Sequence, residues 1–485
     1  MRSIRSEHMS YIWLLAGFLL LVFSNGINHI IPFATWIAPV FLIRFLRTQT
    51  RTKGLILFAP VNCAAWIIMQ YGIYPDLGVL GNGFGIFYGI IFFLPFLADR
   101  LMTPRIQGLT ATLVFPSVWV TIEFMLSSWE YTGSWFSLAY TQRDNLPLIQ
   151  LASVTGIWGI SFLVAWFASV ANWAWEQDFS MSRIWQGISL YLGILIFVLL
   201  LGGAYLTLLP ADSETVRAAT VTRSFDMNVQ AKKCKGDIPC LRELFKWSLD
   251  EFLQGSKQAV DAGAKIVVWQ ENGLAVYQDD ESGFIERGRE FAMREDAFLI
   301  MGMHMFSEDW SVDENKAILI SPSGQVSEYL KNSLVVGDNH VLGDGKVLIQ
   351  DSRYGRLAVI ICKDADFPGF VRQAGRENVD LMLIPTEDWD AITPSHARMT
   401  SFRAIENGFS MIRADYHGLS TAVDYHGNIL SQMNDFTTTD RVMLADLPQR
   451  GIKTVYSQIG DIIAWLCVFG LLGLIVLAAT NRKEV

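Results

Sequence analysis

Residues 186–222 read QGISLYLGILIFVLLLGGAYLTLLPADSETVRAATVT and contain the boundary between two kinds of chain. Residues 186–209 hold no charged side chain, and roughly 20 mostly apolar residues suffice for a helix to cross a bilayer. After Pro210 the chain becomes polar, and residues 217–222 are predicted to form a strand. This stretch therefore predicts a membrane part before it and a globular part after it.

The distribution of charge along the chain agrees with this division. Of the 85 Asp, Glu, Lys and Arg residues in the 485-residue chain, 18 lie in residues 1–210 and 67 in residues 211–485. The first part is thus about 9% charged and the second about 24%, near the ~25% of soluble domains. Over the whole chain 51% of residues are hydrophobic and the mean hydropathy is +0.30. This composition excludes a uniformly soluble enzyme, a disordered chain and a small disulfide scaffold.

The globular part carries the negative charge. Residues 1–210 sum to about +2 and the whole chain to −9, so residues 211–485 carry about −11. An acidic domain repels phosphate backbones, so nucleic acid is not a predicted partner.

Five cysteines in 485 residues are few. Cys63 and Cys467 lie in apolar runs, where a thiol usually packs as a small hydrophobic group. Cys234 and Cys240 flank a short polar loop and could form a disulfide if that loop lies outside the cytosol.

Eight segments are candidate membrane spans: 10–25, 30–46, 54–74, 80–98, 108–126, 150–175, 186–209 and 458–480. The second span contains Pro32 and Pro39 and is predicted to be tilted or broken. With a cytoplasmic N-terminus, eight spans place nine basic residues inside: Arg44, Arg47, Arg51, Lys53, Arg100, Arg105, Arg183, Arg482 and Lys483. The positive-inside rule then puts the globular part on the outer face of the membrane. The predicted divisions are 1–210, 211–455 and 456–485.

Two polar features of the membrane part exceed what an anchor needs. Glu123 lies within an apolar run, where a carboxylate is costly. The loop 132–142 is rich in aromatic residues, including Trp135 and Tyr140. It is interpreted either as an interfacial aromatic belt or as the lipid-facing wall of an active site.

The globular part mixes strands that follow one another directly with strands separated by helices. Helical spacing of apolar residues covers 241–253, and further helices are predicted at 367–377 and 395–407. The predicted strands are 217–222, 265–270, 297–303, 317–320, 326–330, 356–361, 381–385, 409–414 and 420–424. This order predicts an α+β domain with sheets covered by helices.

Three chemically useful residues follow predicted strands. Glu271 comes after 265–270, Lys331 after 326–330 and Cys362 after 356–361. Strand ends are where sheet proteins gather catalytic groups. A carboxylate can take the proton of a thiol, and an ammonium can stabilise both the thiolate and an oxyanion. Together the three residues predict a cysteine nucleophile with an acid–base partner.

The surroundings of these residues resemble a known superfamily. Residues 268–272 (VWQEN), 329–335 (YLKNSLV) and 360–368 (IICKDADFP) resemble the three signatures of the carbon–nitrogen hydrolase (nitrilase) superfamily, in its order and spacing. The resemblance implies an αββα sandwich domain and maps the family's Glu-Lys-Cys triad onto Glu271, Lys331 and Cys362.

The membrane part resembles one branch of that superfamily, the bacterial apolipoprotein N-acyltransferases. The resemblance rests on 119–142 and 156–163 (GIWGISFL) of the membrane part, and it extends to 396–399 (HARM), 413–414 (RA) and 418–424 (GLSTAVD) of the globular part. It implies a multi-pass protein of the bacterial inner membrane with its catalytic domain on the periplasmic face. It also implies that an acyl chain passes from a phospholipid, through a cysteine thioester, to the N-terminal amine of a lipoprotein.

The sequence departs from the family pattern beside the triad. Val336-Gly337-Asp338 stands where the family has Pro-Phe-Gly-Glu, and Cys362-Lys363-Asp364 where it has Cys-Tyr-Glu. Lys363 is interpreted as a residue that lowers the thiol pKa, contacts a lipid phosphate or points into solvent. Six residues are candidate substrate contacts: Trp135, Tyr140, Asp338, Lys363, Asp364 and Trp389.

These departures leave alternatives open. One is a membrane-tethered amidase or nitrilase that uses water, another an acyltransferase with a different amine acceptor, and a third an inactive binding or assembly protein. The seven histidines show no ligand spacing and no Gly-rich phosphate loop precedes a helix, so neither a metal nor a cofactor is predicted. The protein is expected to be a monomer.

Overall fold

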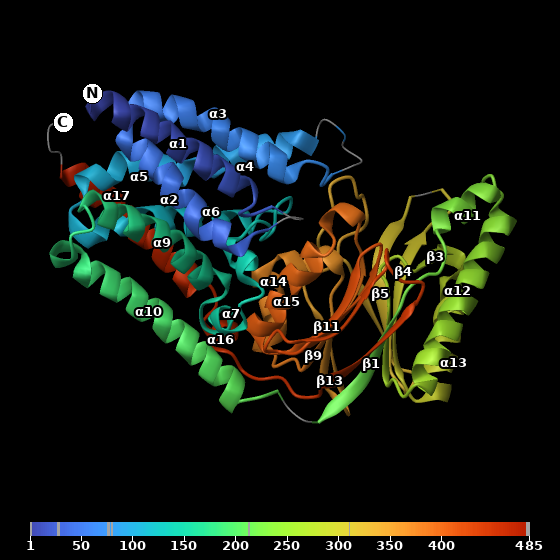
Figure 1. The fold of residues 1–485 in the computed structure, drawn as a ribbon. Helices are drawn as coiled ribbons and strands as arrows, with labels where there is room; N and C mark the ends of the chain where they lie inside the picture. Colours follow the sequence, from blue (N-terminus) through green and yellow to red (C-terminus); the bar gives the residue numbers. More distant parts are fainter. Residues whose placement is uncertain are drawn as a thin grey trace. The chain divides into compact units, whose positions relative to one another are not determined.

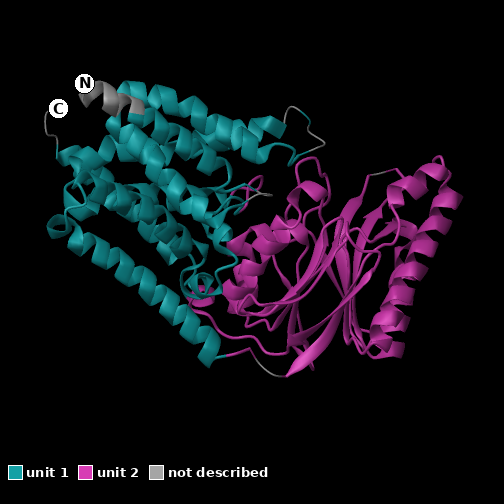
Figure 2. Ribbon diagram, viewed as in Figure 1, with its two compact units in different colours: residues 1–128, 134–209, 459–485 teal, residues 129–133, 210–458 magenta. Residues whose placement is uncertain are grey.

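The computed structural model describes residues 2–26, 30–74, 78, 81–211, 214–309 and 311–481, with the backbone alone for residues 2–8. Arg482 and Lys483 of the predicted positive-inside pattern lie outside the described residues. The chain forms two compact units (Figure 2). The helical unit comprises residues 1–128, 134–209 and 459–485, and the sheet unit comprises residues 129–133 and 210–458.

The helical unit consists of apolar helices of unequal length. Within the described ranges six helical segments are long and apolar enough to cross a membrane: Arg51–Gln70, Asn82–Arg105, Gly108–Leu126, Ile157–Glu176, Met181–Leu208 and Ile462–Thr480. The helices of this unit are α1 (Arg2–Val22), α2 (Pro32–Thr48), α3 (Arg51–Gln70), α4 (Asn82–Ile91), α5 (Leu94–Met102), α6 (Val114–Leu126), α7 (Leu146–Ile149), α8 (Ala152–Thr155), α9 (Ile157–Glu176), α10 (Met181–Leu208) and α17 (Ile462–Thr480), with α16 (Val455–Ile459) at the junction of the two units. Composition and helix length therefore agree in indicating a membrane protein.

The first two predicted spans form the helices α1, of 21 residues, and α2. The apolar part of α1 is Met9–Val22, and α2 has 17 residues. The predicted break in α2 is wrong, because Pro39 lies inside a continuous helix and Pro32 occupies its first turn, where a missing N–H costs little. The span predicted at 80–98 is instead divided between α4 and α5, and Pro95 lies in the first turn of α5.

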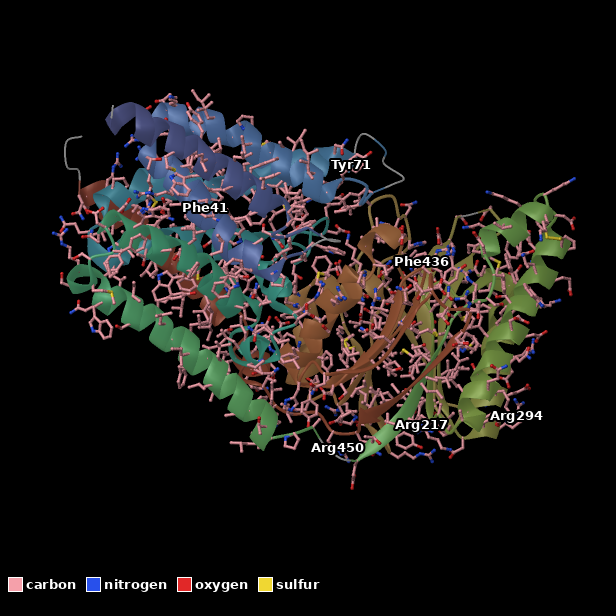
Figure 3. The ribbon with its side chains drawn as sticks, viewed as in Figure 1. Phe41, Tyr71, Arg217, Arg294, Phe436 and Arg450 are labelled. Atoms are coloured by element: carbon pink, nitrogen blue, oxygen red, sulfur yellow. A yellow bond between two sulfur atoms is a disulfide. The ribbon has the colours of Figure 1, made fainter. Side chains whose placement is uncertain are left out.

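Close packing and a few buried polar groups hold the helical unit together. Trp13 stacks on Phe41, which Figure 3 labels, with ring centroids 5.5 Å apart. Gly202 is needed in α10, because a Cβ there would lie 1.9 Å from the carbonyl oxygen of Pro147. Buried Arg47 donates two hydrogen bonds to Asp99, of 2.6 and 2.9 Å. Partnered in this way, charges can lie among apolar helices.

Glu123 has such partners as well. Its carboxylate accepts hydrogen bonds from the Trp119 indole (2.8 Å), the Ser137 hydroxyl (2.9 Å) and the Leu138 backbone N–H (2.9 Å). The buried carboxylate therefore fixes the start of the short helix η4 (Leu138–Gln142), within the aromatic loop, to α6.

The sheet unit contains two sheets built largely by sequential pairing. The first has the order β13-β1-β2-β4-β5-β6, with β3 paired to β4, and the second has the order β12-β11-β10-β9-β8-β7. The strands are β1 (Thr215–Val221), β2 (Ile266–Trp269), β3 (Leu274–Tyr277), β4 (Phe298–Phe306), β5 (Asp313–Ile320), β6 (Val326–Leu330), β7 (Leu348–Ser352), β8 (Gly355–Val359), β9 (Leu381–Glu387), β10 (Ser410–Tyr416), β11 (Leu419–Val423), β12 (Ile429–Asn434) and β13 (Val442–Pro448).

The two sheets face each other across one apolar core and carry helices on their outer faces (Figure 1). Side chains such as Val268 and Ile300 of the first sheet pack with Val359 and Leu383 of the second. A separate core lies between the first sheet and helices α12 (Ile238–Asp261) and α13 (Glu281–Glu295). Helices α14 (Pro368–Arg376) and α15 (Ser395–Asn407) cover the second sheet, and α11 (Met227–Lys233) precedes α12. The predicted αββα sandwich is confirmed.

All nine predicted strands exist, with shifts of a few residues at their ends. Four more strands, β3, β7, β12 and β13, were not predicted. Of these, β7 and β12 are edge strands with few buried residues, so the hydrophobic pattern that predicts a strand is weak in them. Cys234, which directly follows α11, and Cys240, in the first turn of α12, form the disulfide that the sequence left open.

Candidate functional site

Glu271 and Lys331 meet at the end of the first sheet. Glu271 lies two residues beyond β2, and Lys331 follows β6 directly; both side chains are 3% exposed. Lys331 Nζ donates a 2.7 Å hydrogen bond to Glu271 Oε1, which also accepts a 2.6 Å bond from Asn315 Nδ2. Burial alone would lower the pKa of Lys331, but attraction to Glu271 and neighbouring acidic groups holds it above its ordinary value. The pair is therefore a buried salt bridge between an acidic and a basic group.

Cys362 lies three residues beyond the end of β8, at the start of a short helical turn. Its backbone has φ +43°, in the left-handed region that costs a non-glycine residue of order 1–3 kcal/mol and that is frequent at active sites. The thiol is buried and its pKa is raised, first by desolvation and then by the charge of Glu271, against the opposing effect of Lys331. The buried thiol is therefore neutral near pH 7, and a nucleophilic role would require its proton to leave during attack.

Glu387 connects these groups and was not predicted from the sequence. Its backbone N–H donates a 3.0 Å hydrogen bond to Glu271 Oε2, and its carbonyl oxygen lies 3.9 Å from Cys362 Sγ. Its carboxylate lies 3.5 Å from the Arg223 guanidinium. Burial raises the pKa of Glu387 to about 7, against the charge of Arg223. A usable signal was present, since Glu387 and Asp388 are an acidic pair just after a predicted strand.

Asp364 joins the short helical turn Cys362–Asp366, here called the cysteine turn, to the chain segment around Lys331. It accepts hydrogen bonds from the Tyr329 hydroxyl (2.5 Å) and from the backbone N–H groups of Asn332 and Ile361 (3.1 Å each). Burial raises its pKa to about 6. Asp364 was predicted as a substrate contact, but this geometry favours a positioning role because its oxygens are occupied within the protein.

Lys363 does not point into solvent, which was one of its three interpretations. Its side chain is buried and donates a hydrogen bond to the carbonyl oxygen of Leu334. Burial lowers the pKa of Lys363. Lys363 thus ties the cysteine turn to the segment that follows Lys331.

A second buried charge network also lies close to Cys362. Asp388 accepts hydrogen bonds from Arg413 Nη2 (2.8 Å) and pairs with His396 Nδ1 (2.6 Å), while His396 Nε2 lies 3.0 Å from Asp366. Burial would lower the pKa of His396, but the charges of Asp388 and Asp366 raise it to about 9. A ligand-type atom of Cys362, Asp388 and His396 lies within 4.8 Å of each of the others. The resemblance covered His396 and Arg413 at 396–399 and 413–414, but sequence reasoning did not predict that these residues form a network with Asp388.

The other predicted substrate contacts lie in different parts of the chain. Asp338 lies beside the Glu271–Lys331 pair, with its carboxylate 3.7 Å from Lys331 Nζ. Trp389 follows Asp388 and is partly exposed. Trp135 and Tyr140 belong to the helical unit, where the Tyr140 hydroxyl donates to Ser134 Oγ (2.7 Å).

Residues 129–133, which precede Trp135, belong to the sheet unit. A Cβ on Gly133, which has φ +53°, would lie 2.8 Å from Cβ of Asp366 in the cysteine turn. Trp129 and Tyr131 pack edge to face, with centroids 5.7 Å apart, and are 44% and 51% exposed. The close contact of Gly133 with Asp366 places the exposed side chains of Trp129 and Tyr131, in the same loop, near the cysteine turn. The sequence analysis did not select these two residues.

Two family models match the chain. The carbon-nitrogen hydrolase model matches residues 238–456, and the model of the apolipoprotein N-acyltransferase N-terminal domain matches residues 16–170. The first segment contains Glu271, Lys331 and Cys362, and the second contains Glu123 and the aromatic loop.

Curated relatives resemble both parts of the chain. An apolipoprotein N-acyltransferase of Geobacter metallireducens is 26% identical over 78% of this chain and 76% of its own. That of Rickettsia prowazekii is 26% identical over 72% of this chain and 73% of its own. Apolipoprotein N-acyltransferase 1 of Treponema denticola is 24% identical over 91% of this chain and 90% of its own. Both parts of the chain are therefore similar to apolipoprotein N-acyltransferases, the globular part through the carbon-nitrogen hydrolase model and the membrane part through the N-terminal domain model.

Proposed function

We propose that this membrane enzyme transfers a fatty acyl chain from a phospholipid to the α-amine of the N-terminal diacylglyceryl-cysteine of a lipoprotein. The observation that carries the proposal is the buried Glu271–Lys331 pair beside the neutral thiol of Cys362, in a chain whose other half is apolar helices. A hydrophobic donor and a lipid-anchored acceptor both suit a cysteine enzyme held in a membrane.

The first half-reaction loads the cysteine. Glu271 takes the thiol proton as Cys362 Sγ attacks the ester carbonyl of the phospholipid, and Lys331 stabilises the oxyanion that forms. The ester C–O bond then breaks, and Glu271 returns the proton to the leaving alkoxide. The products are an acyl thioester on Cys362 and a lysophospholipid. Because the resting thiol is neutral, base and nucleophile must act together in this step.

The second half-reaction transfers the acyl chain to the amine. The lipoprotein α-amine attacks the thioester carbonyl, Glu271 accepts the amine proton and the C–S bond breaks. The proton returns to the sulfur, so the amide product leaves the thiol as it was. No cofactor or metal takes part in either step, and one protomer contains all three groups.

The proposed location is the bacterial inner membrane with the sheet unit on the periplasmic face. The Cys234–Cys240 disulfide supports this side, because disulfides persist in oxidising compartments. The basic residues of the connections Arg44–Lys53 and Arg100–Arg105 support a cytoplasmic position for those connections. We propose that Trp129, Tyr131 and Trp389, which are exposed or partly exposed near the cysteine turn, guide the acyl chains.

Mass spectrometry of the Cys362 peptide tests the proposal. Detergent-purified protein is incubated with phosphatidylethanolamine and then with a diacylated lipopeptide. We expect a hydroxylamine-sensitive fatty-acyl adduct that disappears as the lipopeptide gains one acyl chain, and no adduct on the Cys362→Ala variant. The Cys467→Ala variant, which alters a buried thiol of α17, is the matched control and is expected to form the adduct.

Other outcomes separate the alternatives. A folded wild-type protein that never gains the adduct contradicts a phospholipid donor. An adduct that only water removes contradicts the lipoprotein acceptor. Hydrolysis of a small amide is not favoured, because the relatives are acyltransferases by name and the aromatic loop of the membrane part would have no role in it.

A further inference from the structure

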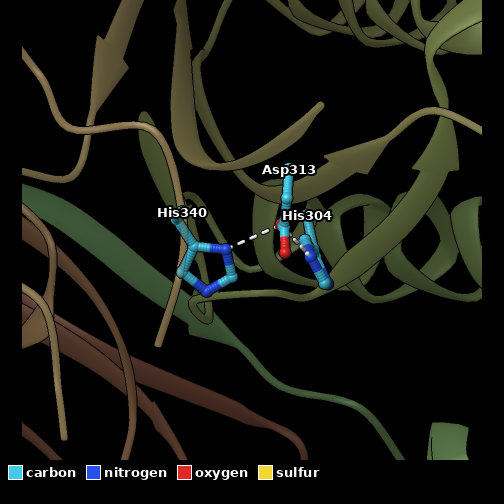
Figure 4. Close-up of side chains that lie close together, drawn as sticks. All are labelled: His304, Asp313 and His340. Atoms are coloured by element: carbon cyan, nitrogen blue, oxygen red, sulfur yellow. Dashed lines mark hydrogen bonds and ion pairs between the residues drawn. The ribbon is translucent and has the colours of Figure 1, made fainter. Parts of the chain in front are cut away.

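A cluster of two histidines and an aspartate lies outside the residues assigned to acyl transfer (Figure 4). His304 is on β4, Asp313 begins β5, and His340 is in the segment between β6 and β7. We call residues 331–347, which connect Lys331 to β7, the lysine loop. Sequence spacing could not reveal this cluster, because strand pairing and the return of the lysine loop bring its members together.

The strand register explains why His304 and Asp313 share a face. His304 pairs with Asn315 across the antiparallel β4–β5 ladder, and Asp313 is two residues from Asn315 on the same strand. Side chains two residues apart point to the same side of a sheet. Asn315 is the residue that donates to Glu271, so the cluster lies beside the supports of the Glu271–Lys331 pair.

The lysine loop supplies the third side chain. The backbone N–H of Val341 donates a 2.9 Å hydrogen bond to the carbonyl oxygen of Asp313, which fixes the neighbouring His340 over β5. Lys331 N–H bonds to Asn315 O (2.9 Å) and Gly343 N–H to Lys331 O (3.0 Å). The loop therefore rests on β5 at both its start and its middle.

One carboxylate oxygen faces both imidazoles. His304 Nε2 and His340 Nδ1 each lie 2.6 Å from Asp313 Oδ1, as the dashed lines of Figure 4 mark. The side chains of His304, Asp313 and His340 are 25%, 24% and 12% exposed, so an ion can reach them. His304 also lines a cavity of about 350 Å³ together with Arg223, Asn272 and Glu387.

We propose that His304, Asp313 and His340 bind a divalent transition-metal ion, with Zn²⁺ as the best fit, and that the ion holds the lysine loop against β5. Two imidazole nitrogens and a carboxylate oxygen suit Zn²⁺ rather than Mg²⁺ or Ca²⁺, which select oxygen ligands. The ligand-type atoms lie within 4.8 Å of one another. Zinc–ligand bonds of about 2.0–2.2 Å place the ligand atoms about 3.3 Å apart. Small side-chain rotations are therefore enough to replace the two hydrogen bonds by bonds from the imidazole nitrogens and the Asp313 oxygen to the ion.

The site differs from the other group of ligand-type atoms in the described chain. Around Cys362, Asp388 and His396, both imidazole nitrogens already face carboxylates and Arg413 Nη2 lies 2.8 Å from His396 Nδ1. A second cation there would meet the guanidinium charge. No charged nitrogen of Arg or Lys pairs with Asp313 in the described ion pairs, which leaves its charge to the two imidazoles and the metal.

Metal content measured on the full-length protein tests the proposal. The Cys362→Ala variant in detergent is stripped with a chelator, dialysed against Zn²⁺ and analysed by mass spectrometry for bound metal. The Cys362→Ala variant serves as the parent protein because it lacks the thiol as a competing ligand. The result is then independent of acyl transfer. We expect about one Zn²⁺ per chain, unaffected by excess Mg²⁺.

Two variants and a control make the measurement specific. Asp313→Asn keeps an oxygen that accepts from both imidazoles but loses the negative charge, so it is expected to fold normally and to bind Zn²⁺ at least tenfold more weakly. His340→Ala is expected to abolish stoichiometric binding. His417→Ala, which alters a half-buried histidine outside the cluster, is expected to bind as the parent does. Equal binding by Asp313→Asn and the parent, or no binding by the parent, would overturn the proposed site.

Hydrogen exchange of the lysine loop tests the role of the ion. Zn²⁺ is expected to slow amide exchange in residues 331–347 of the parent by about tenfold, and to leave the same peptides of His340→Ala unchanged. Zn²⁺ that binds without slowing exchange in this loop would overturn the proposal that the metal holds it.

Discussion

Two buried charge networks lie close to Cys362, and they differ in how far their charged groups are exposed. In the first, Lys331 is shared by Glu271 and, at 3.7 Å, by Asp338, whose side chain is 29% exposed. In the second, Arg413 lies between Asp388 and Asp415, all with side chains at most 1% exposed. The first network therefore reaches solvent through Asp338, whereas these three side chains of the second network are enclosed. From this difference we expect the first network to take part in the chemistry and the second to hold a fixed charge.

Neutralising the first network should have the largest effect on activity. Glu271→Gln removes the base that a neutral thiol needs, so we expect thioester formation to fall by about 10²–10⁴-fold. Lys331→Met should cost about 10²–10³-fold, because the oxyanion loses its cation. The measurement is the rate of acyl-adduct formation on Cys362 with phosphatidylethanolamine. Asn332→Ala, beside Lys331 but outside the pair, is the comparison, and a similar loss in it would contradict the assigned roles.

Removing the cation of the second network should instead cost stability. Arg413→Met leaves Asp388 and Asp415 buried and facing each other, so we expect a loss of about 3–5 kcal/mol in the free energy of unfolding. Arg217, labelled in Figure 3, makes a comparable bidentate pair with Asp446, but both side chains are about half exposed. Arg217→Met should therefore cost about 0–1 kcal/mol. Chemical denaturation of both variants in detergent measures the difference.

Arg413→Lys shows whether charge or geometry matters in that network. Lysine restores one positive charge but cannot bond Asp388 and Asp415 through a planar fork. Partial recovery of stability is expected. If Arg413→Met were as stable as Arg217→Met, the enclosed network would not be the stabilising element described above.

The sequence predicted the first network and missed the second for a physical reason. Glu271, Lys331 and Cys362 each follow a strand, so a local pattern and the superfamily resemblance both select them. Asp388, His396 and Arg413 come from a strand end, a helix and the interior of β10, and their meeting depends on the order of the strands. The α+β order was predictable because the central strands are continuously apolar, whereas the edge strands β7 and β12 are not; the αββα sandwich itself came from the superfamily resemblance.

Loosening the link that Asp364 makes between the cysteine turn and the segment around Lys331 should have an intermediate effect on the rate of acylation. Asp364→Asn replaces a carboxylate that accepts from Tyr329, Asn332 and Ile361 by an amide with one acceptor oxygen. We expect about a 10-fold slower acylation of Cys362, in the lower part of the range for groups that orient catalytic residues. Asp364→Glu should not rescue it, because the longer side chain cannot reach the same three donors within a packed turn. Wild-type acylation by Asp364→Asn would show that the link is dispensable.

The last prediction concerns the pH dependence of stability caused by Glu387. This residue borders both networks, and its titration indicates how well their boundary is shielded from water. Burial raises its pKa to about 7, whereas an unfolded glutamate has a pKa of about 4.3. Between these values the folded protein keeps a proton that the unfolded chain has lost, so stability falls as pH rises through this window. Glu387→Gln does not titrate, and relative to wild type it should gain on the order of 1 kcal/mol from pH 5 to pH 8, a value reduced for the 27% exposure of the side chain. Thermal unfolding at the two pH values measures this, with Glu243→Gln, an exposed site, as the control. If the stability of Glu387→Gln and of Glu243→Gln changed with pH by the same amount, water would reach Glu387 freely. The contrast between a solvent-bordering and an enclosed network would then hold only for residues nearer to Cys362.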